Sequence, residues 1–482
     1  MVIKFISIII FPEFFLTIGV LLLLILGLFI KEDVFKKISY LSIFLLIAVI
    51  LLIFNNSTIS YAFYNTLFTT SQFILLFKVL VTVGCLVTIA ISTNYLNELN
   101  LNKFEIPILL LFSTLGMMIL ISSNNLMSMY LGIELQSLSL YVVAAINRNS
   151  VQSSEAGVKY FVLGALSSGI LLYGCSLIYG FTGSTNFEDI RLILQELRTL
   201  NIGILFGLIF ILVGLAFKIS AVPFHMWTPD VYEGAPTAIT AFFAIVPKLA
   251  GVALIYRVCL EPFGDFVNDW RQVIIFLSIL SMFVGAFAAL VQKNLKRLLA
   301  YSSIGHIGYV LIGLAAANSE GIKGLVIYMI FYLFMNIGIF TIILSMRIQD
   351  QYVELLKDLS GLSKRRPIIS LCIAIIMFSM AGIPPFAGFF GKFYIFIAAI
   401  EADLIYLAVL GVISSVIAAY YYLRIIKIMY FDSVDSEVRN QLTITSKSKI
   451  ILLISILIIS LFVIYPSFLT NISDQISSSF FI

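Results

Sequence analysis

Charged side chains are scarce in this sequence. Asp, Glu, Lys and Arg make up 11% of its 482 residues, whereas hydrophobic residues make up 61%. Soluble domains average about 25% charged residues, so the composition excludes an ordinary soluble fold and predicts a polytopic membrane protein. The formal net charge is only +4, and the basic residues fall mostly in short segments between apolar runs. We therefore expect no nucleic-acid partner.

Ligands for metals and redox cofactors are also scarce. The chain has two histidines and four cysteines, and it lacks CxxC, GxGxxG and GxxxxGK[ST] motifs. Each cysteine stands alone inside an apolar run, and we interpret it as a small core residue. These are Cys85, Cys175, Cys259 and Cys372. We expect no metal, nucleotide, iron–sulfur or haem site in this chain.

Long apolar runs, by contrast, are abundant. A membrane-spanning helix needs about 20 apolar residues, and by this measure the chain holds about fourteen such helices. They lie near residues 8–30, 39–54, 72–93, 105–123, 126–146, 156–181, 202–232, 236–259, 273–292, 296–317, 321–346, 367–399, 403–430 and 448–466. The first run is too long for the core of a cleavable signal peptide, so we expect it to be retained.

Proline interrupts the seventh and the twelfth of these runs. Pro223 breaks the first, between Lys218 and Lys248, and the pair Pro384 and Pro385 breaks the second. A proline removes a backbone donor and clashes with the preceding turn. In lipid, the freed backbone groups are tolerated only where protein or a water-filled cavity satisfies them. Two broken helices therefore favour an ion path over a plain anchor.

The spacing of the two breaks, five helices apart, predicts an internal repeat. A unit with an odd number of helices must insert its two copies in opposite senses, as in many transporters. We accordingly divide the chain into four parts: three N-terminal helices (residues 1–104), a first repeat (105–260), an inverted second repeat (261–430) and a C-terminal helix with its tail (431–482).

Basic residues are distributed unequally between the two ends of the predicted helices. Most of them follow odd-numbered helices, for example Lys31, Lys103 and Arg297. Basic loops stay on the cytoplasmic side, or on the equivalent matrix side of a mitochondrion. This asymmetry predicts an even number of helices with both termini on the outer side.

Two charged residues near the first break are candidates for a functional pair. Glu134 lies about two turns into the fifth helix, and Lys218 lies just before Pro223. An opposite charge nearby favours the charged form of a lysine, so this pair is a candidate switch. Two structural interpretations remain: an ion pair that fastens two helices, and a lysine that reaches the membrane interface.

Lysines inside the apolar runs are the candidate proton carriers. A charge at the centre of a spanning helix costs about 2.5–3.5 kcal/mol, and a buried lysine loses its proton readily. Lys248 lies deep in the eighth helix, and Lys392 follows the second break. Lys392 also suits an interfacial anchor. Lys159, near the start of the sixth helix, is as consistent with an interfacial position as with function.

The remaining ionisable residues have weaker claims. His306 in the tenth helix is a candidate relay, because histidine titrates near neutral pH, and a hydrogen-bonded core histidine is the alternative. His225 lies within the first break, where Trp227 and Pro229 favour a structural role. Lys78, at the start of the third helix, is interpreted as an interface lysine.

Four stretches resemble a known family. They are VPFHMWTPDVYEGAPTAITAFFAIVPKLAG (222–251), YLGIELQSLSLYVVAA (130–145), EAGVKYFVLGALSSGILLYG (155–174) and LLAYSSIGHIGYVLIG (298–313). They resemble the antiporter-like membrane subunits of proton-pumping NADH:quinone oxidoreductase, respiratory complex I, in particular the N-type subunit that is subunit 2 in mitochondria. The likeness covers about residues 105 to 430.

The resemblance implies a function for the buried charges. Glu134, Lys218, Lys248 and Lys392 match the family's glutamate and lysines of helices five, seven, eight and twelve, and Lys159 matches a helix-six lysine. It implies proton transport without redox chemistry in this chain, with NADH, FMN, iron–sulfur clusters and ubiquinone in partner subunits. The implied partners are a neighbouring antiporter-like subunit, small membrane subunits and membrane lipids.

Two other functional classes stay open at this point. Mrp-type cation/proton antiporters share the fold, and a structural spacer of the membrane arm would also carry helix-fastening lysines. The chain's richness in Ile, Phe, Ser and Asn and its few charges favour the mitochondrial inner membrane, with a bacterial plasma membrane as the alternative.

Overall fold

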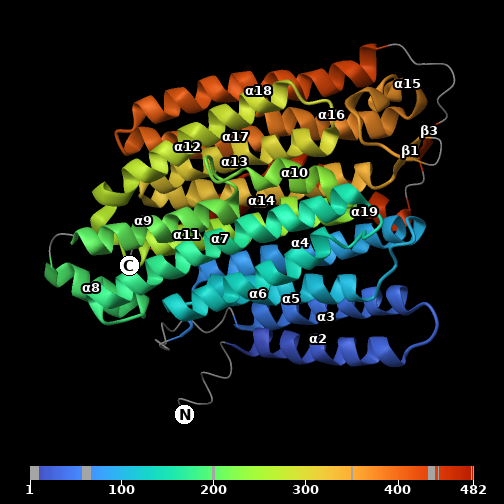
Figure 1. The fold of residues 1–482 in the computed structure, drawn as a ribbon. Coiled ribbons are helices and arrows are strands. Elements are labelled where there is room, and N and C mark those ends of the chain that lie inside the picture. Colours follow the sequence, from blue (N-terminus) through green and yellow to red (C-terminus); the bar gives the residue numbers. More distant parts are fainter. Residues whose placement is uncertain are drawn as a thin grey trace. The chain divides into compact units, whose positions relative to one another are not determined.

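The computed structural model describes residues 10–56, 67–197, 201–348, 351–432, 440–442, 445–478 and 480. Most of these residues are helical (Figure 1). In chain order the helices are α2 (Phe11–Phe29), α3 (Val34–Asn56), α4 (Gln72–Glu98), α5 (Glu105–Ser122), α6 (Leu126–Ala144), α7 (Val151–Thr182), α8 (Phe187–Leu197), α9 (Ile202–Ile219), α10 (Trp227–Gly234), α11 (Thr237–Leu260), α12 (Val267–Leu290), α13 (Leu295–Ala316), α14 (Ser319–Ile343), α15 (Leu362–Arg365), α16 (Pro367–Ala381), α17 (Ala387–Glu401), α18 (Ile405–Phe431), α19 (Ser446–Leu461) and α20 (Ser467–Ser478). Two short 3₁₀ turns, η1 (Gly264–Phe266) and η2 (Leu356–Leu359), complete the helical elements of the described residues.

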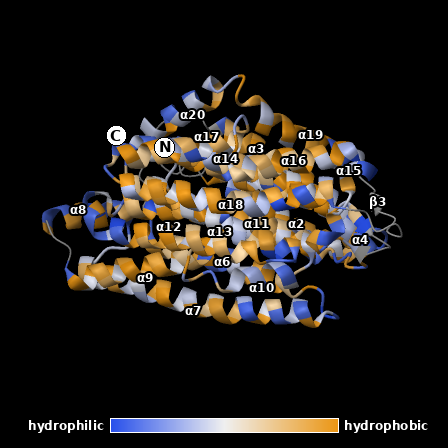
Figure 2. Cartoon of the chain, turned by 90° about the horizontal axis from the view of Figure 1, so that it is seen from above, coloured by the Kyte–Doolittle hydropathy of each residue, from blue (hydrophilic) through white to orange (hydrophobic). Residues whose placement is uncertain are grey.

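The long helices confirm the predicted membrane spans. Within the described residues, 12 helices are long and apolar enough to cross a membrane. The half-helices α16 and α17, together with α19, correspond to the two remaining predicted runs. Figure 2 shows apolar residues along the length of these helices, with hydrophilic residues gathered at α8 and near α15 and β3. The protein is a multi-pass, all-α membrane protein.

Two short helices and a small sheet were not predicted from the sequence. The helices α8 and α20 are too short and too polar to span a membrane. In α8, Phe187, Ile190 and Leu194 are buried, and this spacing gives the helix one apolar face. Three short strands form an antiparallel sheet in the order β2-β1-β3. Their bounds are β1 (Met346–Ile348), β2 (Gln351–Tyr352) and β3 (Asn440–Leu442).

The contacts divide the chain into two compact units. The first unit comprises Met1–Ile219 and Val246–Gln272, and the second comprises Ser220–Ile245 and Val273–Ile482. The division passes through α11, whose first residues belong to the second unit and whose remainder belongs to the first. The four sequence-based segments remain a prediction.

Both predicted helix breaks are confirmed. The first helix ends at Ile219 and the chain resumes helical structure at Trp227, with Pro223 between them. The second break lies between α16 and α17, where Gly382 adopts the left-handed conformation with φ +84°. Its N–H donates to the carbonyls of Phe378 and Ser379, which is how a glycine ends a helix. Each break also contains a cis X–Pro bond.

Small residues let two helices of the first unit approach closely. A Cβ atom on Gly116 of α5 would lie 2.6 Å from the backbone nitrogen of Gln136 on α6. A Cβ atom on Gly132 would lie 2.8 Å from the backbone nitrogen of Leu120. Small residues at such crossings are the usual means of packing membrane helices. This contact holds α6, which carries Glu134, in a fixed position.

Candidate functional site

Lys218 lies at the last turn of α9, directly before the first break. Its side chain is buried, and its Nζ donates a hydrogen bond to Ser137 Oγ of α6 at 2.6 Å. The ammonium lies 5.8 Å from the ring centre of Phe217 and 6.0 Å from that of Tyr141. Position in the last turn suits a cation, because the helix dipole is negative there. Lys218 is therefore a buried cation rather than an interfacial one.

Glu134 lies one turn before Ser137 on the same helix. It is partly buried, and its Oε1 has no hydrogen-bond partner among the described residues. No ion pair between Glu134 and Lys218 occurs in the described part of the chain. The structure thus brings the two predicted residues to the same region, with the Ser137 hydroxyl as the direct ligand of the lysine.

Lys248 lies near the middle of α11 and is 0% exposed. The helix itself is an apolar span that is buried along its length. Pro247 precedes the lysine, and a proline cannot donate to the carbonyl four residues earlier. The predicted deep position of Lys248 is confirmed, in a helix locally weakened by the adjacent proline.

Lys392 of α17 lies at the second break, inside the second unit. Its Nζ donates to the carbonyl oxygens of Ala381 at 2.9 Å and Met380 at 3.3 Å, and to Ser415 Oγ at 2.8 Å. The two carbonyls belong to the end of α16, where the break removes the donors of the next turn. The side chain is buried, so Lys392 is not an interfacial anchor in this structure.

The ammonium of Lys392 also lies 4.7 Å from the centre of the Tyr309 ring, the geometry of a cation–π contact. Tyr309 accepts a hydrogen bond from Ser414 Oγ at 3.1 Å. The Tyr309 ring lies beside that of His306, with 6.4 Å between the ring centres. Lys392, Tyr309 and His306 line the same narrow internal gap.

His306 connects two tyrosines inside the second unit. Its Nδ1 lies 2.6 Å from the Tyr328 hydroxyl, and its Nε2 lies 3.1 Å from the Tyr422 hydroxyl. The Tyr422 hydroxyl in turn lies 2.5 Å from Ser302 Oγ. A neutral imidazole donates through one nitrogen and accepts through the other. The arrangement is a continuous, buried chain of hydrogen-bonding groups.

Lys159 differs from the other candidate lysines. It pairs with Glu155 one turn earlier at 2.7 Å, and the two side chains are 42% and 56% exposed. Such exposed pairs contribute little to stability. Within the first unit, the structure places Lys159 at the surface rather than beside Lys218.

The sequence interpretation missed a buried ion pair. Lys78 of α4, interpreted above as an interface lysine, is buried and lies 2.5 Å from the Glu13 carboxylate of α2. The interpretation of Lys78 is corrected by this contact. The sequence did contain a signal for this ion pair, because Glu13 and Lys78 are oppositely charged and each interrupts an apolar run.

The contacts of Lys218 and of His306 were not predicted, although some of the residues that make them were visible in the sequence. Ser137, Ser302 and Tyr309 are visible as polar residues in apolar runs. Tyr328 and Tyr422, however, lie in other helices, 22 and 116 residues from His306. Only the packed structure places their hydroxyls against the imidazole ring.

Comparisons with known proteins support the resemblance seen in the motifs. The family model described as NADH:quinone oxidoreductase/Mrp antiporter, TM, matches residues 123–418. NADH-quinone oxidoreductase subunit N of Paramagnetospirillum magneticum is 50% identical over 465 residues, which cover 95% of this chain and 94% of the relative.

Two solved structures have the same fold. A chain of respiratory complex I from Thermus thermophilus, 28% identical, matches with a TM-score of 0.82 over 96% of this chain and 99% of its own. A chain of the Mrp complex from Dietzia sp. has a TM-score of 0.85 at 20% identity, over 98% and 97% of the two chains, which shows a shared fold alone. The family predicted from the motifs is confirmed. This chain belongs to the NADH:quinone oxidoreductase/Mrp antiporter family of membrane subunits, in the group of NADH-quinone oxidoreductase subunit N.

Proposed function

We propose that this chain moves protons across the membrane as a membrane-arm subunit of respiratory complex I. Electron transfer from NADH to quinone takes place in partner subunits and drives the movement. The observation that carries the proposal is the site of Lys392, a buried ammonium bound by the carbonyls of a broken helix and adjacent to the His306 chain. Broken helices that place charged groups in the membrane interior are typical of ion transport.

The proposed switch is the region of Glu134 and Lys218. Quinone reduction elsewhere in the complex changes the charge along the row of buried groups. A nearby anion favours the ammonium form of a lysine, so movement of Lys218 between Ser137 and Glu134 alters its readiness to release a proton. The Ser137 contact supports this proposal because it represents one of the two positions that such a switch requires.

The proposed order of proton transfer starts at Lys218. A change in its charge shifts the protonation of Lys248, which exchanges its proton with Lys392 and then with an exit to water. His306 and its tyrosines act as the relay beside Lys392. Protons pass readily along such chains of hydroxyl and imidazole groups, since each member both donates and accepts.

We propose that the chain itself carries out no redox step. Its four cysteines lie in α4, α7, α11 and α16, and among the described residues no group of three or more His, Cys, Asp or Glu side chains is placed to hold a metal ion. NADH, FMN, iron–sulfur clusters and ubiquinone are assigned by this proposal to partner subunits. The neighbouring membrane subunits are another antiporter-like chain and small membrane chains.

The location is proposed from the relatives and from the loop charges. The bacterial relatives support the plasma membrane, which was the alternative to the mitochondrial inner membrane. The positive loops support an arrangement with both termini on the outer side. Residues 1–9 and 481–482 lie outside the described part of the chain.

The native assembly tests this function first. Membranes are solubilised in mild detergent, separated on a native gel and stained for NADH dehydrogenase activity. We expect this chain, identified by mass spectrometry, in the large NADH-oxidising band. Migration in a smaller assembly without this activity would support the Mrp-type alternative, for which cation-driven proton exchange is the assay.

Variants then separate proton transport from a spacer role. Lys392→Met, reconstituted in proteoliposomes as part of the complex, should assemble normally but transport fewer protons per NADH oxidised. Lys159→Met is the matched control, because its ammonium is exposed and paired at the surface. If Lys392→Met impairs assembly and leaves the proton ratio of the assembled fraction unchanged, the spacer interpretation is correct.

A further inference from the structure

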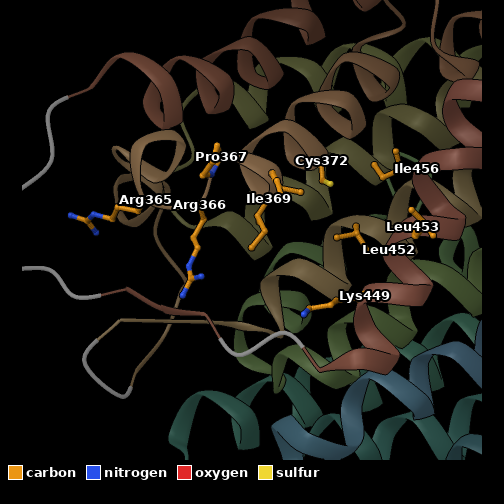
Figure 3. Close-up of a pocket in the computed structure, with 10 residues that line it drawn as sticks. Arg365, Arg366, Pro367, Ile369, Cys372, Lys449, Leu452, Leu453 and Ile456 are labelled. Atoms are coloured by element: carbon orange, nitrogen blue, oxygen red, sulfur yellow. The ribbon is translucent and has the colours of Figure 1, made fainter.

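A groove in the second unit has apolar walls and a basic entrance. It has a volume of about 550 Å³ and runs between the first turns of α16 and those of α19 (Figure 3). Ile369 and Cys372 contribute one wall, and Leu452, Leu453 and Ile456 contribute the other. The walls consist of aliphatic side chains and one thiol, so the groove suits a hydrocarbon occupant.

Three basic residues line the entrance: Arg365, Arg366 and Lys449. Arg366 and Lys449 are exposed, and within the described part of the chain neither has an ion-pair partner. In Figure 3, Arg366 and Lys449 extend to the same side of the groove, whereas Arg365 points away. None of the described residues that line the groove is acidic. The entrance is therefore complementary to an anion.

The two helices increase the positive potential at this entrance. Both α16 and α19 begin there, with no acidic residue in the first turn of either. A helix N-terminus carries a partial positive charge, and a lysine such as Lys449 in the first turn is unfavourable without an anion nearby. The arrangement of charges and apolar walls matches a molecule with an anionic head and a slender hydrocarbon chain.

We propose that this groove binds an anionic phospholipid, with its phosphate between Arg366 and Lys449 and one acyl chain along the apolar walls. Ile368 and Leu453 at its edge are 77% and 58% exposed, as expected for side chains that face lipid. The basic loops lie on the side whose leaflet carries anionic lipids.

Photo-cross-linking in the intact complex tests the proposal. The complex is reconstituted in phosphatidylcholine nanodiscs that contain photoactivatable phosphatidylglycerol, or photoactivatable phosphatidylcholine with the same acyl chains. Mass spectrometry then locates the labelled peptides. We expect the phosphatidylglycerol probe to label segments 365–372 and 449–456 well above the phosphatidylcholine probe, and unlabelled phosphatidylglycerol to compete.

Charge variants measure the contribution of the entrance. Each basic residue near an anionic surface contributes an affinity factor of about five. The double variant Arg366→Gln with Lys449→Gln should therefore raise the mole fraction of unlabelled phosphatidylglycerol that halves the labelling by about 25-fold. The matched control is Lys364→Gln with Lys447→Gln, which removes the same charge from exposed residues outside the groove lining. This control should lower the labelling far less than the entrance pair does.

A second variant fills the groove without changing its charge. Leu453→Trp should remove phosphatidylglycerol labelling while the amount of assembled complex on a native gel stays the same. Equal labelling by the two probes would overturn the proposal, as would an equal effect of the control pair. Competition by inorganic phosphate with no effect of Leu453→Trp would show a free-anion site instead. Cross-links from a partner peptide, with no lipid label, would show a protein occupant.

Discussion

The buried pair Glu13–Lys78 gives a sharp quantitative test of the packing of the first unit. The two groups lie 2.5 Å apart, and their side chains are 5% and 3% exposed respectively. Neither oxygen of Glu13 has another hydrogen-bond donor in the described residues. Lys78→Met therefore leaves a buried carboxylate without compensation, and such a loss costs about 3–5 kcal/mol.

Thermal unfolding of the purified full chain in detergent measures this cost. A thiol-reactive dye reports the exposure of the buried cysteines, one of which, Cys85, is fully buried on the same helix as Lys78. At about 2–4 °C for each kcal/mol, the midpoint of Lys78→Met should fall by about 6–20 °C. The double variant Glu13→Gln with Lys78→Met removes both charges and should recover most of that loss.

The exposed pair Glu155–Lys159 provides the control. Its groups are 2.7 Å apart but 56% and 42% exposed, so Lys159→Met should cost at most about 1 kcal/mol. A Lys78→Met midpoint equal to that of Lys159→Met would refute the argument from burial. A double variant as unstable as Lys78→Met would refute the assignment of the cost to the unpaired carboxylate.

Three further predictions follow from individual contacts. Ser137→Ala removes the hydroxyl that accepts from Lys218 and should lower the protons transported per NADH oxidised, measured in proteoliposomes, whereas Ser139→Ala should not. Gly382→Ala forces a side chain into a left-handed conformation and should cost about 1–2 kcal/mol, seen as a lower thermal midpoint than for the wild type. Asp474→Asn weakens the 2.8 Å contact of Lys323 with the C-terminal helix and should speed limited proteolysis of α20 without changing NADH oxidation; unchanged proteolysis would contradict the docking role.

The spans and the breaks were predictable from the sequence for simple reasons. Apolar length alone defines a membrane helix, and proline acts locally through its missing N–H. Pro223 and the pair Pro384–Pro385 therefore indicated both interruptions before any packing was known. The depth of Lys248 followed in the same way, because its distance from both ends of an apolar run can be counted.

Contacts between distant segments were not predictable. The hydroxyls of Tyr328 and Tyr422 meet His306 only because three helices pack together. The burial of Lys78 depends on Glu13, 65 residues earlier in the chain. In the sequence alone, a single lysine near a helix end indicates an interface residue. The elements α8, α20 and the short sheet carry too few apolar residues to be seen as spans.

Neutralisation of Lys248 tests the central claim most directly. Lys248→Gln is introduced into the intact complex, and protons transported per NADH oxidised are measured in proteoliposomes, with Lys323→Gln as a control outside the proposed path. The account predicts a lower proton ratio and slower coupled turnover for Lys248→Gln, with an unchanged ratio for Lys323→Gln. An assembled Lys248→Gln complex with wild-type ratio and turnover would contradict it.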